Sequence, residues 1–214
     1  MNFLDYKNNV HSQNGEDGII KEIFKRLKIE DGYLCEFGAW DGISLSNTFN
    51  VYKDNTNFTG ILIESNEEYH KALIENLQDI TNKICLHRFV KPDPDDPSSL
   101  NNILSEAGLD DLKDNFSLLS IDIDSCDYEI WKGFDRYRPK VVVIEVNSSY
   151  PPEQKVYPCE PSGASAGITT DLAAEKGYKL VCHTGNLIFV TEELFDLLEI
   201  EEKGLEDLFQ RNWL

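Results

Sequence analysis

The sequence lacks the features that would insert it into a membrane or export it. No stretch of its 214 residues approaches the roughly 18 apolar residues that a membrane-spanning helix needs. Residues 1–9 contain neither a basic leader followed by an apolar run nor a small-residue cleavage site. Hydrophobic residues make up 41% and charged residues 28%, a globular balance. We therefore expect a soluble cytoplasmic protein, with a single domain over 1–214.

Positive charge is also scarce. Twenty Lys and Arg stand against 39 Asp and Glu, which gives a net charge of −19. Such a field repels phosphate backbones and anionic lipid surfaces, so nucleic acid is not an expected partner. A cationic ligand would be tolerated, although much of the charge is expected to lie on solvated faces.

Paired cysteines are missing as well. The five cysteines are widely scattered and form no C-x-x-C pair. Neither a disulfide framework nor a zinc site is therefore expected, and a reducing cytoplasm fits this pattern.

In place of internal repeats, the chain alternates strand-like and helix-like segments. The N-terminal segment, 1–30, is expected to be helical and contains an amphipathic helix that ends near Lys28. A capping box at 65–68 predicts a helix that continues through Leu77. Further helices are expected at 47–52, 99–107, 128–131 and 170–176. The expected strands are 33–37, 58–63, 84–90, 116–123, 140–146, 178–182 and 187–190. The last two flank a Gly-Asn turn and predict a hairpin. The pattern predicts an α/β fold with a doubly wound, mostly parallel seven-stranded sheet and a terminal antiparallel hairpin.

One connection in this pattern is unusually long. Residues 147–167 are rich in Pro, Ser, Gly and Tyr and show no periodicity. Long connections of this kind are either functional or partly disordered. We interpret this segment as a substrate loop.

The turn from Glu36 to Gly42 follows the first strand and precedes a helix. Gly38, Ala39 and Gly42 are small residues that let the backbone approach a nucleotide-like ligand there. The G-x-G-x-x-G spacing of dinucleotide-binding proteins is absent. Trp40 lies midway between Gly38 and Gly42. A tight turn without a ligand would explain the segment about as well.

Glu64 closes the second expected strand. A carboxylate in this position can accept two hydrogen bonds from a ribose diol, which is the role that we predict. The alternative is a charge beside Ser65 that is stabilised by a helix N-terminus.

Acidic residues are densest after the fourth and fifth strands. Asp122 and Asp124 follow the fourth strand, and Glu145 and Asn147 close the fifth, so that four oxygen-bearing side chains can converge at one edge of the sheet. Oxygen ligands suit Mg²⁺, Mn²⁺ or Ca²⁺. The alternative is that Asp127 caps the next helix while Asp122 or Asp124 binds backbone amides.

Two further groups are candidates for the site. His183 lies at the tip of the hairpin, where an exposed loop histidine is the commoner outcome, but it could act as a base, as could Asp124, if no metal binds. The polar segment 12–18, with Gln13, could fold over the pocket. It also fits a turn followed by Glu16 and Asp17 in the first turn of a helix.

Taken together, several segments resemble the FkbM-like methyltransferases, a family of the class I fold. These are 12–18, the 36–42 turn, 46–48, 61–64, 118–127 and 141–147. The resemblance implies O-methylation with S-adenosylmethionine, commonly on sugar-related metabolites and in some bacterial members on surface-polysaccharide precursors of the capsule type. It also implies cofactor contacts at positions that include Gln13, Asp41, Asn47 and Asp122.

Metal-dependent catechol-type methyltransferases place acidic and amide residues similarly, and Asp122, Glu145 and Asn147 match that pattern. The predicted mechanism is in-line transfer of the sulfonium methyl to a substrate oxygen, assisted by Mg²⁺ or Mn²⁺.

Two other functions remain open at this point. Asp122-Ile123-Asp124 is also the D-x-D pattern of metal-dependent glycosyltransferases, and a non-catalytic binding module would keep the cofactor site without activity. The acceptor is expected to be a small molecule or glycan precursor, with a sugar hydroxyl or a phosphoramidate group as the methylated part. The sequence does not specify the oligomeric state.

Overall fold

The computed structural model describes residues 2–109, 111–157 and 163–210. Its centre is a seven-stranded sheet in the order β3-β2-β1-β4-β5-β7-β6. The strands are β1 Gly32–Phe37, β2 Phe58–Glu64, β3 Lys83–His87, β4 Phe116–Ile121, β5 Val141–Glu145, β6 Tyr178–His183 and β7 Asn186–Thr191. Only β7 runs antiparallel to its neighbours β5 and β6. The predicted fold class is thus confirmed.

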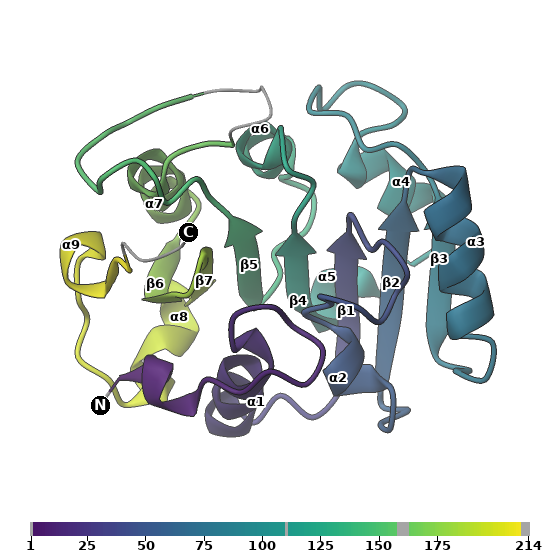
Figure 1. Ribbon diagram of the computed structural model, residues 1–214, viewed down its shortest axis with the longest axis horizontal. Coiled ribbons are helices and arrows are strands. Elements are labelled where there is room, and N and C mark those ends of the chain that lie inside the picture. The colour runs from purple at the N-terminus through teal and green to yellow at the C-terminus, as the bar shows by residue number, and fades with distance from the viewer. Residues whose placement is uncertain (1, 110, 158–162, 211–214) are drawn as a thin grey trace.

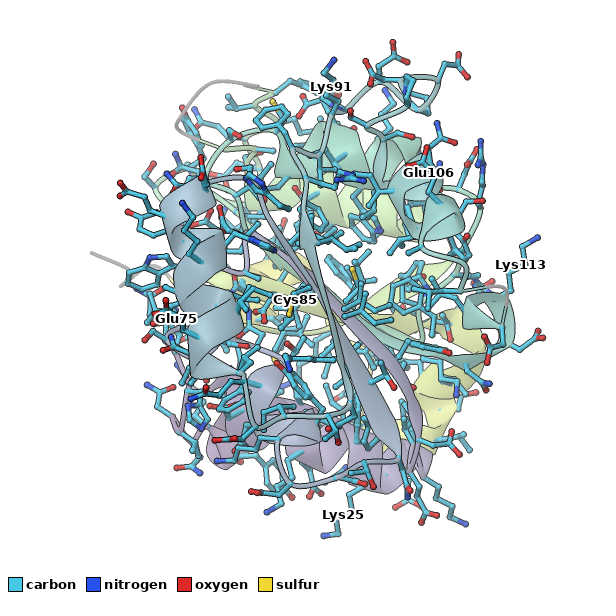
Figure 2. The ribbon with its side chains drawn as sticks, turned by 90° about the vertical axis from the view of Figure 1, so that its right-hand side faces the viewer. Lys25, Glu75, Cys85, Lys91, Glu106 and Lys113 are labelled. Carbon is cyan, nitrogen blue, oxygen red and sulfur yellow. The ribbon has the colours of Figure 1, made fainter. Side chains whose placement is uncertain are left out.

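Helices cover both faces of this sheet (Figure 1). Their bounds are α1 Glu16–Leu27, α2 Phe49–Tyr52, α3 Glu67–Asn76, α4 Leu100–Glu106, α5 Leu112–Asn115, α6 Asp127–Gly133, α7 Ala166–Glu175, α8 Glu192–Phe195 and α9 Leu205–Leu208, with short 3₁₀ turns at Phe3–Tyr6 and Asp196–Leu198. Figure 2 shows α3, which carries Glu75, on one side of the sheet, and Glu106 of α4 and Lys113 of α5 on the other. None of the described helices is long and apolar enough to cross a bilayer.

Each face has its own hydrophobic core because side chains alternate along a strand. Within β1, Leu34 packs with α1, α2 and α3, whereas Cys35 and Phe37 pack with α4, α6 and α7. The central strands β4 and β5 are buried along almost their whole length. This is the arrangement that their continuous apolar runs predict.

Three local predictions need correction. The third strand ends at His87, so that residues 88–90 lie in the following loop, and α7 begins at Ala166, four residues before the expected start. Cys126 is disulfide-bonded, whereas no disulfide was expected. Cys35, Cys85 and Cys182 are free thiols, and burial raises the pKa of each.

Candidate functional site

A pocket opens at the carboxyl ends of β1, β2, β3 and β4, with an empty volume of about 540 Å³ including open solvent at its mouth. Its walls are mostly apolar and are formed by Phe37, Gly38, Ile63, Ser65, Arg88, Phe89, Val90, Pro92, Ile123, Ser125 and Cys126. The edge formed by the carboxyl ends of parallel strands is where open α/β sheets bind ligands. Residues 88–90 were missed as pocket residues because sequence reasoning placed them inside a strand.

Gly38 brings the β1 turn against the end of β4. Its φ is +79°, and a Cβ atom at this position would lie 1.9 Å from the carbonyl oxygen of Asp122. The Gly38 amide also donates to the carbonyl of Ile63 at the end of β2. Gly38 therefore brings the ends of β1, β2 and β4 together at one point.

Trp40 occupies the middle of the same turn with a φ of +47°, a conformation that costs a non-glycine residue free energy. Its amide donates to Oε2 of Glu64 at 2.9 Å. Its indole is 40% exposed and meets the ring of Tyr69 edge-on, with centroids 6.0 Å apart.

Glu64 lies at the end of β2 and is 6% exposed. Besides the bond from Trp40, its Oε1 accepts from the amide of Asn66 at 2.6 Å. The cap of α3 is Asn66, whose side chain accepts from the amides of Glu68 and Tyr69. Glu64 therefore joins the β1 turn to the end of β2 beside the pocket residue Ser65, and each of its oxygens retains a second lone pair.

Glu36 is buried and is engaged entirely within the chain. Its carboxylate accepts from the hydroxyls of Ser46 and Thr48 and from the amide of Asn47, at 2.6 to 2.8 Å. Burial raises its pKa, and these hydrogen bonds oppose that rise. Its visible role is to fold segment 46–48 against β1, where the side-chain amide of Asn47 donates to Ser120 Oγ on β4.

Among the predicted cofactor contacts, Gly38 alone is one of the residues that line the pocket. Glu36, Ala39, Gly42, Asn47, Glu64 and Asp122 lie in the neighbouring turns and strand ends, and two others, Asp41 and Gln13, have partners elsewhere. Asp41 is half-buried, and its carboxylate accepts from the amides of Ile43 and Ser44. Gln13 is exposed, and its carbonyl accepts from the side chain of Asn9. The structure provides no pocket contact for either.

The rest of segment 12–18 follows its structural interpretation. Glu16 and Asp17 are buried in the first turn of α1. Asp17 Oδ2 accepts from three successive amides, those of residues 10–12, and Glu16 Oε1 accepts from Thr184 Oγ1 at 2.7 Å. Asp17 therefore holds residues 10–12 against the start of α1, and Glu16 joins the start of α1 to the β6–β7 turn.

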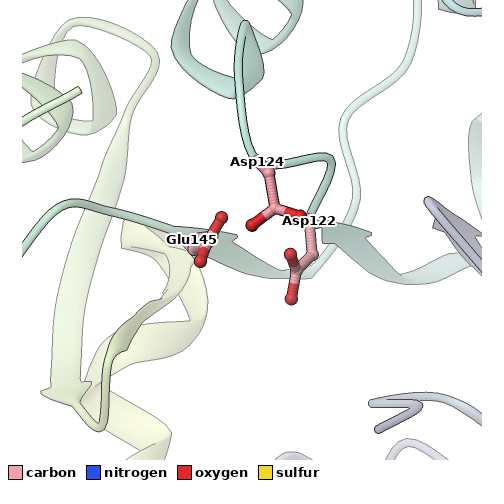
Figure 3. Close-up of side chains that lie close together, drawn as sticks. All are labelled: Asp122, Asp124 and Glu145. Atoms are coloured by element: carbon pink, nitrogen blue, oxygen red, sulfur yellow. The ribbon is translucent and has the colours of Figure 1, made fainter. Parts of the chain in front are cut away.

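Three of the four predicted metal ligands do converge. Oxygen atoms of Asp122, Asp124 and Glu145 lie within 4.8 Å of one another (Figure 3). Burial, with repulsion from Glu145 second, raises the pKa of Asp122 to about 8, and burial with repulsion from Asp127 and Asp124 raises that of Glu145 to about 7. Crowded carboxylates of this kind hold a proton or a cation near neutral pH.

The remaining oxygen donors of this region have other partners. Asn147 Oδ1 accepts from the amide and hydroxyl of Ser149. Asp127 accepts from the amides of Ile123 and Ser125 and so fixes the loop that carries Asp124, which has a φ of +59°. Asp127 therefore braces that loop, while the N-cap position of α6 is Cys126.

The expectation of an exposed His183 is wrong, because its ring is 0% exposed. It lies at the end of β6 with Ser148 Oγ 2.9 Å from Nε2, and its Nδ1 accepts from the amide of Gln210 at 2.9 Å. Burial lowers its pKa to about 4. Both ring nitrogens are occupied by protein groups, so the structure gives no support to the predicted role as a base.

Comparison with known proteins gives fold neighbours only. No protein-family model and no curated protein matches the chain, so membership of the FkbM-like family stays a prediction. Among solved structures, the CurJ carbon methyltransferase aligns with a TM-score of 0.54 and 10% identity over 88% of this chain and 56% of that one. Monomeric WbdD aligns with a TM-score of 0.51 and 11% identity over 86% and 42%.

A SAM-dependent methyltransferase from Aquifex aeolicus aligns at 13% identity over 79% of this chain and 86% of that one, with a TM-score of 0.45. The chain spans about half of the length of CurJ and less than half of that of WbdD. The sheet order and the alignment with CurJ together establish that this protein has the class I methyltransferase fold.

Proposed function

We propose that this protein transfers a methyl group from S-adenosylmethionine to an oxygen atom of a small acceptor. The observation that carries the proposal is the common edge on which the apolar pocket, Glu64 and the carboxylates of Asp122, Asp124 and Glu145 lie. The flat aromatic base of the cofactor would lie against the mostly apolar lining, which includes Phe37, Phe89 and Ile123. Glu64 would accept from the ribose hydroxyls with its free lone pairs.

The acidic side chains are suited to the chemistry of the transfer. Methyl transfer to a hydroxyl requires the donor carbon and the oxygen to be held close and aligned, and the proton of that oxygen to be removed. The pKa of Asp122 is raised to about 8 and that of Glu145 to about 7, so near neutral pH the ionised form of Glu145 can accept that proton while Asp122 holds its own. The negative field also favours a cationic donor over a neutral one.

The same carboxylates fit a hard divalent cation. Three side chains offer oxygens within 4.8 Å of one another, which is the donor type that Mg²⁺ and Mn²⁺ prefer. When bound, such an ion supplies positive charge that orients a hydroxyl and lowers its pKa. We assign Asp122, Asp124 and Glu145 to this site and leave Asn147 out because its oxygen binds Ser149.

The acceptor that we propose is a sugar-related or phosphoramidate-bearing precursor of a bacterial surface polysaccharide. Its support is the sequence resemblance, together with the oxygen-rich acidic edge. The convergence of Asp122 with Asp124 also suits the D-x-D glycosyltransferase alternative. We disfavour that alternative because it gives no role to Glu64 or to the terminal hairpin.

Calorimetric titration tests the proposal. We expect S-adenosylmethionine and its demethylated product to bind one site, and Mn²⁺ to bind wild-type protein but not the Asp122→Asn variant. Asp79→Asn, an exposed position with the same charge change, serves as the control. Binding of a nucleotide sugar without binding of S-adenosylmethionine would refute methyl transfer.

A further inference from the structure

The buried ring of His183 lies between two segments that are distant in the sequence. On one side it contacts Ser148, in the loop that follows β5, and on the other it contacts Phe209 and Gln210, which follow α9. The rings of His183 and Phe209 are stacked, with centroids 4.8 Å apart and planes within 2°. The β6 strand supplies the imidazole itself.

The hydrogen bonds determine which nitrogen carries the proton. The backbone amide of Gln210 can only donate, so Nδ1 of His183 must accept with its lone pair. A neutral imidazole then carries its proton on Nε2 and donates it to Ser148 Oγ. Burial lowers the pKa of His183 to about 4, in agreement with a neutral ring.

This polarity excludes a serine–histidine nucleophile. In such a pair, the histidine nitrogen that faces the hydroxyl must be free to take its proton. Here that nitrogen already holds a proton, so Ser148 is the acceptor of the bond. The contact therefore holds the backbone in place and does not activate the serine.

The backbone that it holds leads from the acidic cluster into the described part of the substrate loop. Ser148 lies three residues after Glu145. The backbone amide of Asn147, the residue before Ser148, donates to the carbonyl of Ala164, and the backbone amide of Val156 donates to Ser165 Oγ. The loop is thus closed at its base, and Ser148 is its link to the β6–β7 hairpin.

We propose that segment 205–210 positions the substrate loop through His183. His183 is thus a positioning residue, and Ser148 is the loop residue that it contacts. This inference rests on the proposed function for the loop's role toward the acceptor. The linkage itself is independent of that role. Phe209 and Gln210 hold the ring in one orientation and one tautomer, and the ring holds the start of the loop beside Glu145.

Hydrogen exchange of the full chain, measured by mass spectrometry, tests the linkage with a matched pair of variants. Gln210→Pro removes the amide donor, and Gln210→Ala keeps it. Phe209 already has φ −66° and ψ 128°, the region that a residue before proline adopts, so the proline does not distort its neighbour. We expect the backbone amides of the non-proline residues in 148–157 to exchange about tenfold faster in the proline variant, the factor that corresponds to about 1.4 kcal/mol. The alanine variant should match wild type.

Two further measurements separate positioning from a general loss of stability. Ser148→Ala should speed exchange in the loop while residues 205–210 stay protected and β1 stays unchanged. The imidazole ¹⁵N resonances of His183 should show the Nε2–H tautomer in wild type and Gln210→Ala, and lose it in Gln210→Pro. An Nδ1–H tautomer in wild type, or equal loop exchange in the two Gln210 variants, would overturn the proposal.

The demethylated cofactor product, titrated into the same variants, keeps the two proposals apart. Unchanged affinity in Gln210→Pro, with faster loop exchange, supports both. Absence of binding in every variant would refute the proposed function and leave the exchange result to decide the linkage.

Discussion

The α-carbon of Gly38 packs against the carbonyl oxygen of Asp122, so closely that a Cβ atom on Gly38 would lie 1.9 Å from that oxygen. This contact joins the turn after β1 to the start of the acidic cluster after β4. The distance between the candidate cofactor pocket and the candidate proton acceptors is therefore determined by backbone, which moves less freely than side chains.

Gly38→Ala should destabilise the protein strongly, by about 3 kcal/mol or more, because the methyl group must displace the β4 backbone and φ is +79°. Gly108→Ala is the matched control, since its φ is +71° but nothing lies within 4 Å of the added atom. It should cost about 1 kcal/mol. Urea unfolding of both variants measures the difference, and equal losses would show that the close contact is unimportant.

Glu64→Gln should weaken binding of the demethylated cofactor product by about tenfold to a hundredfold, since a charged acceptor to the ribose is lost. The amide also presents a donor to the amide of Trp40 or Asn66, which now donate to Glu64. Glu67→Gln, an exposed neighbour at the start of α3, is the control. Calorimetry gives both affinities, and an unchanged value for Glu64→Gln would remove the ribose assignment.

Asp122→Asn should stabilise the metal-free protein at pH 8. A folded-state pKa raised to about 8 means that the folded protein holds a proton which the unfolded chain releases near pH 4, so stability falls as pH rises between these values. The neutral amide avoids this loss. We expect a gain of about 1 kcal/mol, or roughly 2–4 °C in Tm for a chain of this size. The gain in stability should vanish at pH 4. Scanning calorimetry at pH 4 and pH 8 measures it, and equal Tm values for variant and wild type at pH 8 would contradict the raised pKa of Asp122.

The contribution of His183 to stability depends on pH in the opposite direction. Its folded-state pKa is lowered to about 4, so between about pH 6.5 and pH 4 the unfolded chain binds a proton that the folded chain does not. Stability from this group is complete above pH 6.5 and is lost as the pH falls through that window. His183→Gln should flatten the stability curve there, by up to about 3 kcal/mol. Parallel curves for the two proteins would contradict the buried neutral state.

The sequence was sufficient to predict the sheet and the edge at which its polar residues gather. Strands β4 and β5 are continuous apolar runs followed at once by acids, and parallel strands bring such ends together. The Gly-Asn turn likewise predicted the one antiparallel hairpin.

Which oxygens remain available was decided by the tertiary structure. Glu36 begins the turn at which the sequence predicts the cofactor, yet the hydroxyls of Ser46 and Thr48 occupy its carboxylate. Asp127 is expected to cap the next helix, yet its carboxylate accepts from the amides of the loop before that helix. Asn147 was expected to be a metal ligand, but the loop turns so that its side-chain oxygen accepts from the amide of Ser149, two residues away.

The burial of His183 is the clearest example of a feature that the sequence alone does not predict. A histidine beside a hairpin turn is exposed in most proteins, and nothing within the hairpin indicates otherwise. Its burial depends on Phe209 and Gln210, which follow it by 26 and 27 residues. Local periodicity encodes which face of an element is apolar, but the segment that finally covers a polar group is chosen by packing across the whole chain.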